Sequence, residues 1–276
     1  METGKFRRSQ RIAAMTSLLG NYPGRLFSLT EFSQQLDTPK SVLSEDISIV
    51  KETMKVLDIG EVQSVAGAKG GIRFIPKMSL HRQKEFLEKL AQELSQHHRI
   101  LPGSYLYYSD LISLPAYVQP MAEILASYMK QSNPQYVVTV ETKGIPLAFA
   151  VARILDKPFV VARRESLMTE GATVSVNYVS GSGNGMQRMV LPRRAIEPGS
   201  RVVMVDDFMR GGGTAKGMQD LMKEFEAEVT DIGVLMASKS PEIKKGGRYT
   251  TLLILENAEE ETGKVDLYPN PELFQE

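Results

Sequence analysis

The sequence has no cysteine, only three histidines, no net charge and no long apolar run. Without cysteine the chain forms no disulfide, thiolate nucleophile or cysteine-based metal site. His81, His97 and His98 lie in or beside one charged segment, which argues against a histidine metal centre. The longest apolar stretches fall short of the roughly 18 residues of a membrane span. The N-terminal segment METGKFRRSQ lacks the apolar core of a signal peptide, so we expect a cytoplasmic protein with no membrane partner.

The chain is long enough for more than one core. It has 276 residues, of which 42% are hydrophobic and 24% charged. That content supports one sizeable core and a second, smaller one. The pattern of the residues changes along the chain, so we expect a small α+β domain over residues 1–76 and an α/β domain over residues 77–276.

The sequence of the first domain predicts three helices and a hairpin. RRSQRIAAMTSLLG carries apolar residues at helical spacing and is followed by a proline and glycine turn. Ser28 and Glu31 are spaced as a capping box, which predicts a short second helix. Thr38 as a cap and Pro39 at the first helical position predict a third helix. The alternating segments EVQSV and GIRFI, joined by AGAKGG, predict a β-hairpin. This order predicts a winged helix.

The pattern resembles the winged helix-turn-helix of bacterial transcription regulators, whose recognition helix enters the major groove of double-stranded DNA. Residues 1–74 hold ten Lys and Arg against eight Asp and Glu, so bulk charge contributes little. Individual polar and basic side chains must then contact the DNA. The candidates are Arg7, Arg8, Lys40, Ser41, Ser44, Lys51, Lys69 and Arg73. The basic residues near the N-terminus fit a solvated helix face equally well, and small three-helix domains also dock proteins.

The second half of the chain alternates strands with helices. The charged amphipathic segment 81–99 predicts a helical connector. After it, near-continuous apolar runs such as PQYVVTVE and SRVVMVDDF are separated by helical segments such as TAKGMQDLMKEF. Apolar strands of this kind form parallel sheets that are covered on both faces. Ligands of such sheets bind at the carboxyl ends of the strands.

One of those strand ends carries two acids and a glycine loop. Asp206 and Asp207 close the run VVMV, and RGGGT then leads into a helix. Adjacent carboxylates accept hydrogen bonds from sugar hydroxyls or help to hold a divalent cation. The glycines permit a turn whose backbone N–H groups converge on an anion, assisted by the helix dipole. The combination fits a sugar phosphate.

The segment VVMVDDFMRGGGT resembles the phosphoribosyl pyrophosphate signature of type I phosphoribosyltransferases. The resemblance implies that Asp206 and Asp207 bind ribose hydroxyls and that Arg210, Gly211, Gly212, Gly213 and Thr214 bind the 5-phosphate, with Phe208 and Met209 between them. The segment VETKGIPLA stands where the family has its pyrophosphate loop. It implies that Glu141, Thr142, Lys143 and Gly144 wrap the diphosphate.

The glycine loop departs from the family signature. Arg210 and Gly211 stand where that signature has two threonines. The backbone donors remain, and Arg210 adds a cation, so we expect ligand binding to survive. The segment 163–189 is polar and glycine-rich, and it resembles the corresponding part of xanthine-type transferases. It fits a catalytic lid or a hairpin without a catalytic role.

A winged helix fused to this domain closely resembles the purine operon repressors of Gram-positive bacteria, over nearly the whole chain. The resemblance implies a homodimer that represses purine genes by binding their operators, with the transferase fold used as a sensor. Phosphoribosyl pyrophosphate, with or without Mg²⁺, is then the effector that weakens DNA binding. Guanosine tetraphosphate is a competing occupant. No catalytic residue and no resident metal are expected, and release from DNA is either allosteric or competitive.

Two further functions stay open. One is an active purine phosphoribosyltransferase with an accessory domain, and the other is a scaffold whose winged helix contacts proteins. The aromatic residues do not decide between them. SYLYYS places Tyr105 and Tyr107 on one face of a predicted strand, where each could stack on a base or belong to the core.

Overall fold

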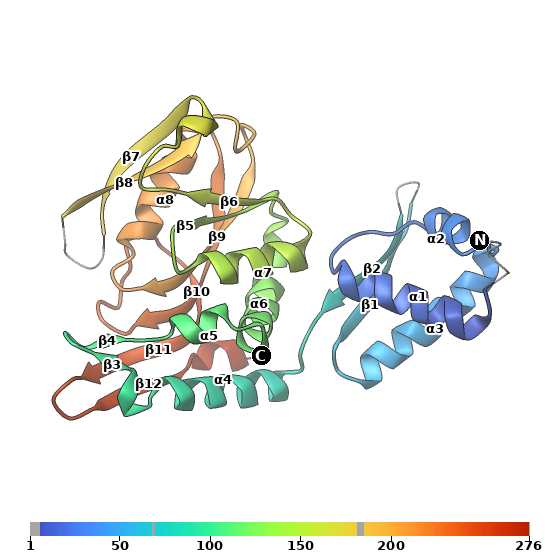
Figure 1. Cartoon of the computed structure of the whole chain (residues 1–276), viewed down its shortest axis with the longest axis horizontal. Coiled ribbons are helices and arrows are strands. Elements are labelled where there is room, and N and C mark those ends of the chain that lie inside the picture. Colours follow the sequence, from blue (N-terminus) through green and yellow to red (C-terminus); the bar gives the residue numbers. More distant parts are fainter. Residues whose placement is uncertain (1–5, 68–69, 181–184, 276) are drawn as a thin grey trace. The chain divides into compact units, whose positions relative to one another are not determined.

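The computed structural model describes residues 6–67, 70–180 and 185–275. The chain forms two compact units, the first made of residues up to Ser79 with Arg153–Asp156 and the second of Leu80–Ala152 and the residues from Lys157 (Figure 1). No helix within the described ranges is long and apolar enough to cross a membrane.

The first unit is a winged helix, as the sequence predicts. Its elements are α1 (Arg8–Asn21), α2 (Leu29–Gln35), α3 (Lys40–Val56), β1 (Gly60–Val65) and β2 (Gly71–Pro76). The strands β1 and β2 pair antiparallel. One core joins the three helices to the hairpin through side chains such as Met15, Phe32, Leu43 and Val62, which are fully buried. This core fixes α3 against the hairpin.

Two predicted caps differ from the structure. Ser28 Oγ accepts from the Glu31 amide at 3.0 Å, but the Glu31 carboxylate binds Arg25 at 2.8 Å, so only half of the capping box forms. Thr38 does not cap α3. Asp37 takes a positive φ of 42°, and buried Thr38 donates to the Leu36 carbonyl at 2.8 Å. The N-cap of α3 is Pro39, because the turn before it directs the Thr38 side chain into the core.

The second unit is built on one six-stranded sheet with the order β12-β11-β10-β9-β5-β6. Every neighbouring pair is parallel except β11 with β12. The sheet strands are β5 (Tyr136–Val140), β6 (Phe159–Ala162), β9 (Arg201–Met209), β10 (Glu228–Ser238), β11 (Thr250–Glu259) and β12 (Lys264–Pro269). Two hairpins add β3 (Ile100–Leu101) with β4 (Tyr105–Leu106) and β7 (Thr173–Val179) with β8 (Met186–Pro192).

Helices accompany the strands along the chain. They are α4 (Leu80–Leu94), α5 (Ser109–Ser113), α6 (Pro115–Met129), α7 (Ile145–Leu155) and α8 (Gly213–Lys223). Short 3-10 turns lie at η1 (His97–Arg99), η2 (Lys130–Ser132), η3 (Met168–Glu170) and η4 (Pro271–Phe274). The alternation of parallel strands and helices confirms the predicted α/β fold. The predicted connector forms α4 and η1, and α4 packs against β12 and α6 within this unit.

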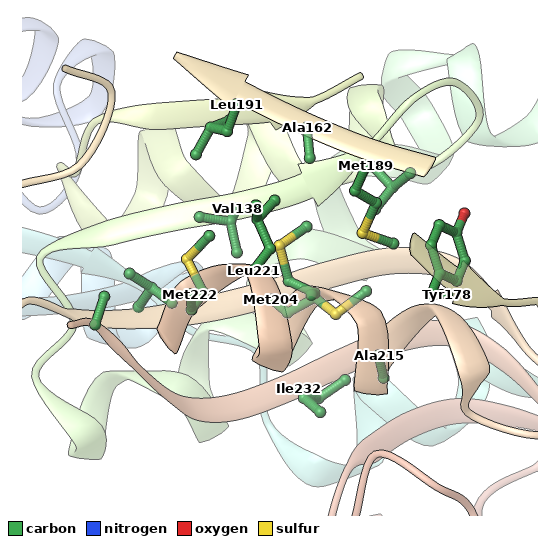
Figure 2. Close-up of a cluster of buried hydrophobic side chains, with 14 of the residues drawn as sticks. Val138, Ala162, Tyr178, Met189, Leu191, Met204, Ala215, Leu221, Met222 and Ile232 are labelled. Atoms are coloured by element: carbon green, nitrogen blue, oxygen red, sulfur yellow. The ribbon is translucent and has the colours of Figure 1, made fainter. Parts of the chain in front are cut away.

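One face of the sheet is covered by α8 and by the β7–β8 hairpin. Figure 2 shows Leu221 and Met222 of α8 close to Val138 and Met204 of the sheet, with Tyr178 and Met189 of the hairpin beside them. All of these side chains are buried. The segment 163–189, which the sequence suggests as a lid, thus contributes buried residues such as Tyr178 and Met189 to the core.

The sheet order brings two separate loops together. The strands β5 and β9 are parallel neighbours, with Val138 opposite Met204. Because parallel strands end at the same edge, the loop after Val140 and the loop after Met209 lie at one edge of the sheet. The site described below is formed there.

Candidate functional site

A cavity of about 1130 Å³ opens at the carboxyl ends of the strands. Its wall includes the end of β9, the glycine loop and the start of α8. Residues 101–106 of the β3–β4 hairpin and residues 255–258 of β11 form another part of the wall. A cavity of this size is large enough for a nucleotide-sized ligand.

The two acids at the end of β9 have different surroundings. Asp206 is only 8% exposed and Asp207 is half-buried. Asp206 Oδ1 accepts a hydrogen bond from the Asp207 amide at 2.9 Å. Burial, and then the neighbouring Asp207, raise the pKa of Asp206 well above its ordinary range. Asp206 is therefore a desolvated acid with a second acid directly beside it at the cavity wall.

Tyr108 connects the acid pair to the loop after β5. Its hydroxyl donates to Asp207 Oδ2 at 2.5 Å. The Lys143 ammonium lies 4.7 Å from the centre of the Tyr108 ring, within the range of a cation–π contact. Burial, and then Asp207, raise the pKa of Tyr108 above its ordinary value, so the phenol stays protonated and donates. Tyr108 thus contacts the end of β9 through its hydroxyl and the loop after β5 through its ring.

The glycine loop has a geometry that a side chain would disturb. Gly212 is the N-cap of α8 and takes a left-handed φ of 76°. A Cβ at this position would lie 2.8 Å from the Lys245 amide nitrogen. Only glycine fits both the conformation and the space. The loop therefore leads directly into α8, whose N-terminal end carries partial positive charge suited to an anion.

The loop after β5 packs against the acid pair. A Cβ on Gly144 would lie 2.8 Å from Asp206 Oδ1 and 2.8 Å from Thr139 Oγ1. Glu141 Oε1 accepts from the Arg164 amide at 2.7 Å, and the Glu141–Thr142 peptide is cis. Lys143 and Arg164 both line the cavity and bring positive charge to its wall.

Most of the predicted ligand residues line the cavity. They are Tyr105, Lys143, Asp206, Asp207, Phe208, Met209, Arg210, Gly212, Gly213 and Thr214. The remaining predicted residues lie outside the cavity wall. They are Tyr107, Glu141, Thr142, Gly144 and Gly211. Within the described part of the chain, no three His, Asp or Glu side chains gather as a metal site.

The expectation that Tyr105 and Tyr107 share one face of a strand is wrong in part. The strand β4 contains only Tyr105 and Leu106, and the chain turns after it. Tyr105 reaches the cavity, whereas Tyr107 does not. Tyr108, which follows the turn, is the tyrosine that contacts an acid. The sequence pattern missed it because strand alternation ends before that residue.

Other parts of the wall were also missed. They are Arg164, Ser180, Ser238, Ser240 and the two segments 101–104 and 255–258. The last segment follows Leu255 near the carboxyl end of a parallel strand, so the rule that located the glycine loop also applies to it. The rule also applies to Ser238, which ends β10, and to Arg164, which follows β6.

The predicted DNA-contact residues are mostly exposed in the winged helix. Arg7 precedes α1, Lys40, Ser41 and Ser44 lie on the first turns of α3, and Lys51 lies farther along it. Arg73 is half-buried and bonds Gln63 across the hairpin at 3.2 Å. Lys69 lies outside the described residues.

Arg8 has a second partner within the winged helix. Its Nε binds Asp46 at 3.1 Å, and Arg11 binds the other Asp46 oxygen at 2.7 Å. Asp46 is 1% exposed, whereas the Arg8 side chain is 58% exposed. Asp46 is thus buried and paired with two arginines, and it ties α3 to α1.

The fold and the site define a phosphoribosyltransferase-fold domain joined in one chain to a winged helix. Residues 7–76 match the family model described as bacterial purine repressor, N-terminal, and residues 108–267 match that of the phosphoribosyl transferase domain. The adenine phosphoribosyltransferase of Saccharomyces cerevisiae is a structural neighbour. It has a TM-score of 0.53 and 21% identity, over 62% of this chain and 98% of that one, which shows the shared fold.

Full-length relatives identify the family. The chain is 43% identical to the purine biosynthesis transcriptional repressor PurR of Bacillus subtilis, over 91% of this chain and 88% of that protein. It is 38% identical to the purine biosynthesis transcriptional activator PurR of Lactococcus lactis, over 83% and 85%. The chain belongs to the PurR family of purine biosynthesis regulators.

Proposed function

We propose that the protein is a DNA-binding transcriptional repressor of purine biosynthesis genes, and that phosphoribosyl pyrophosphate in the cavity lowers its affinity for operator DNA. One observation carries this proposal: a winged helix and a cavity with an acid pair and an anion loop occur in one chain. A transferase has no need of a DNA-reading module. The Bacillus subtilis relative is named a repressor.

The chemistry of the cavity supports a sugar diphosphate as its ligand. Carboxylates of Asp206 and Asp207 accept from ribose hydroxyls, and the amides before α8 suit the 5-phosphate. Lys143 and Arg164 supply positive charge for the diphosphate at the other side. Mg²⁺ fits the same site, because the two carboxylates offer the oxygen ligands that this ion prefers. The ion would arrive with the diphosphate and neutralise part of its charge.

Guanosine tetraphosphate is the second occupant that we propose for the cavity. It carries the same kinds of phosphate groups as the sugar diphosphate, together with a base. Tyr105 and Phe208 both line the cavity and offer aromatic surface for that base. A nucleotide that binds there excludes the sugar diphosphate without releasing the DNA.

The DNA-binding part of the proposal rests on α3. Its first turns present Lys40, Ser41 and Ser44 to solvent, and Arg7 is exposed at the start of α1. As in other helix-turn-helix proteins, these positions would meet base edges and phosphates in the major groove. We further propose a homodimer, because paired half-sites require two copies of the helix. The effector changes DNA affinity only if it binds the two states of the protein differently.

The test is a titration of the full chain on purine-gene promoter fragments at fixed salt. Fixed salt is needed because phosphate contacts make DNA affinity depend steeply on it. We expect specific binding that phosphoribosyl pyrophosphate with Mg²⁺ weakens. Binding that the ligand strengthens would contradict the proposed direction of the effector. A protein that ignores promoter DNA contradicts the proposal.

An active transferase is the alternative, and the retained acid pair and glycine loop favour it. The two functions differ in one product, since transfer to a purine base releases pyrophosphate. We expect no pyrophosphate release above background with adenine, guanine, hypoxanthine or xanthine. Sustained release with any of these bases would show that the fold has kept its enzymatic activity.

A further inference from the structure

The glycine loop is held from behind by a separate segment, residues 238–246, which joins β10 to β11. We call this segment the loop support. The Ser238 hydroxyl lies 3.1 Å from the Arg210 carbonyl and 2.8 Å from the Ser240 carbonyl, and it can donate its one proton to either. The Lys245 amide donates to the Gly211 carbonyl at 3.0 Å. Two consecutive carbonyls of the glycine loop are thus bound to the loop support.

These two hydrogen bonds also fix the direction of the amides. In a trans peptide the C=O and the N–H point in opposite directions. Holding the Arg210 and Gly211 carbonyls on the loop support turns the N–H groups of Gly211 and Gly212 the other way. Carbonyl oxygens repel an anion, whereas amide groups attract it. The loop support therefore decides which polar groups of the loop remain available to a phosphate.

A buried lysine stands at the centre of the loop support. Lys244 is 4% exposed, and its ammonium donates to the Ser238 carbonyl at 2.6 Å and to Ser238 Oγ at 3.3 Å. Lys244 does not line the cavity, whereas Ser238 does. With its Oγ accepting from Lys244, the Ser238 hydroxyl keeps its own proton for the carbonyl of Arg210 or of Ser240. Burial lowers the pKa of Lys244 below its ordinary value.

Further contacts join the loop support to α8. Gln219 donates to the Gly246 carbonyl at 2.8 Å. A Cβ on Gly246 would lie 2.5 Å from the Ala215 Cβ. The loop support is therefore packed tightly against the first turns of the helix as well as the loop.

We propose that Lys244 and Ser238 are positioning residues for the phosphate end of the ligand site. They act by holding the carbonyls of the glycine loop away from the anion, and neither the sequence signature nor the cavity wall reveals Lys244. The inference rests on the proposed function, because it assumes that a sugar phosphate binds this loop. It adds the requirement that affinity for the phosphate depends on a lysine that never touches it.

The test compares two probes on the full chain by calorimetry at fixed salt and Mg²⁺. Ribose 5-phosphate reports on the glycine loop, and inorganic pyrophosphate reports on the loop after β5. We expect Lys244→Met to weaken ribose 5-phosphate binding about tenfold, the usual scale for a lost charge-assisted hydrogen bond. Pyrophosphate binding should change less than about twofold, since no contact to that loop is lost.

Two substitutions of Ser238 test the same inference if Lys244→Met does not fold. Ser238→Ala removes the hydroxyl and should weaken ribose 5-phosphate binding about fivefold. Ser238→Thr retains the hydroxyl and should bind as the wild type does. Lys216→Met removes an exposed lysine of α8 that pairs with Asp220, and it controls for the loss of positive charge alone.

Equal losses for both probes, or no loss for either, would overturn the inference while leaving the proposed function intact. A Lys216→Met loss as large as that of Lys244→Met would also overturn it, because charge alone would then explain the effect. Failure of the wild type to bind ribose 5-phosphate is a different result. It would remove the proposed ligand site itself.

Discussion

Two buried aspartates, one in each unit, differ in how their charge is compensated. Asp46 in the winged helix is 1% exposed and binds Arg8 and Arg11. Asp206 in the transferase fold is 8% exposed and faces Asp207. Among the residues that the structure describes, no basic side chain forms an ion pair with Asp206. The first acid is compensated by two arginines, whereas the second has another acid beside it.

The comparison separates a structural acid from a functional one. A buried carboxylate with two arginines holds helices together, and its removal leaves those cations without a partner. A buried carboxylate beside another acid destabilises the folded chain and persists at sites that bind or react. Both acids come from short acidic pairs, Glu45 with Asp46 and Asp206 with Asp207. The difference lies entirely in what the fold places beside them.

The largest expected effect is a loss of stability on removing Asp46, the acid that binds two arginines. Asp46→Ala should lower the free energy of unfolding of the winged helix by about 3 kcal/mol, because it leaves Arg11 without its partner in a nearly buried position. Urea unfolding followed by circular dichroism measures this change. The matched control is Glu45→Ala, since Glu45 is the exposed neighbour on the same helix and should change stability by less than about 0.5 kcal/mol. Equal effects would mean that the Asp46 ion pairs contribute nothing.

The next effect concerns the hydroxyl group that orients Asp207. Tyr108→Phe removes the donor to Asp207 and should weaken phosphoribosyl pyrophosphate binding about tenfold, as expected for a hydrogen bond to a charged group. Tyr107→Phe serves as the control, because Tyr107 lies outside the cavity wall. Unchanged affinity in Tyr108→Phe would show that the phenol only fills space.

A smaller effect, of opposite sign, is expected at the uncompensated site. Asp206→Asn should raise the melting temperature by about 2–4 °C, or roughly 1 kcal/mol for a domain of this size, because it removes a buried acid that folding must protonate. The folded-state pKa of Asp206 lies above its unfolded value, so the folded state binds the extra proton. The wild type then loses stability as the pH rises above the ordinary range of an aspartate.

The gain from Asp206→Asn should therefore be largest near neutral pH and vanish near pH 4. Thermal unfolding at several pH values measures this dependence. A gain that is independent of pH, or a loss of stability, would contradict the assignment of Asp206 as an uncompensated charge.

The smallest effect on stability is expected from removing Arg8, the more exposed of the two arginines that bind Asp46. Arg8→Ala should lower the stability of the winged helix by only about 0.5 kcal/mol, since exposed ion pairs contribute little. Arg8→Ala and Arg7→Ala can be compared in the same DNA titration. A DNA defect in Arg8→Ala that is as large as in Arg7→Ala would show that Arg8 reaches the DNA despite its bond to Asp46.

Much of the fold follows from local patterns in the sequence. Helical spacing around Met15, the Ser28 cap and the apolar run before Asp206 locate their elements, because each signal lies within one element. The rule that ligands bind at the carboxyl ends of parallel strands then locates the site. The cap at Thr38 was misplaced, because one residue with positive φ turns that side chain inward.

The contacts that give the site its properties are long-range and could not be predicted. Asp46 and Arg11 are 35 residues apart in the chain, and Tyr108 and Asp207 are 99 apart. The spacing of residues along the sequence does not predict which distant side chain will pair with an acid. The same holds for Lys244, whose role depends on the packing of one loop behind another.

The most direct test of the central claim is the response of DNA binding to phosphoribosyl pyrophosphate with Mg²⁺ in Asp206→Asn, beside the wild type, at fixed salt. The account predicts that the variant binds purine promoter fragments as tightly as the ligand-free wild type and does not respond to the ligand. A variant that still responds would contradict the claim that the uncompensated acid is the sensor. A variant that loses DNA binding without ligand would contradict it as well, because Asp206 would then belong to the structure that DNA binding requires.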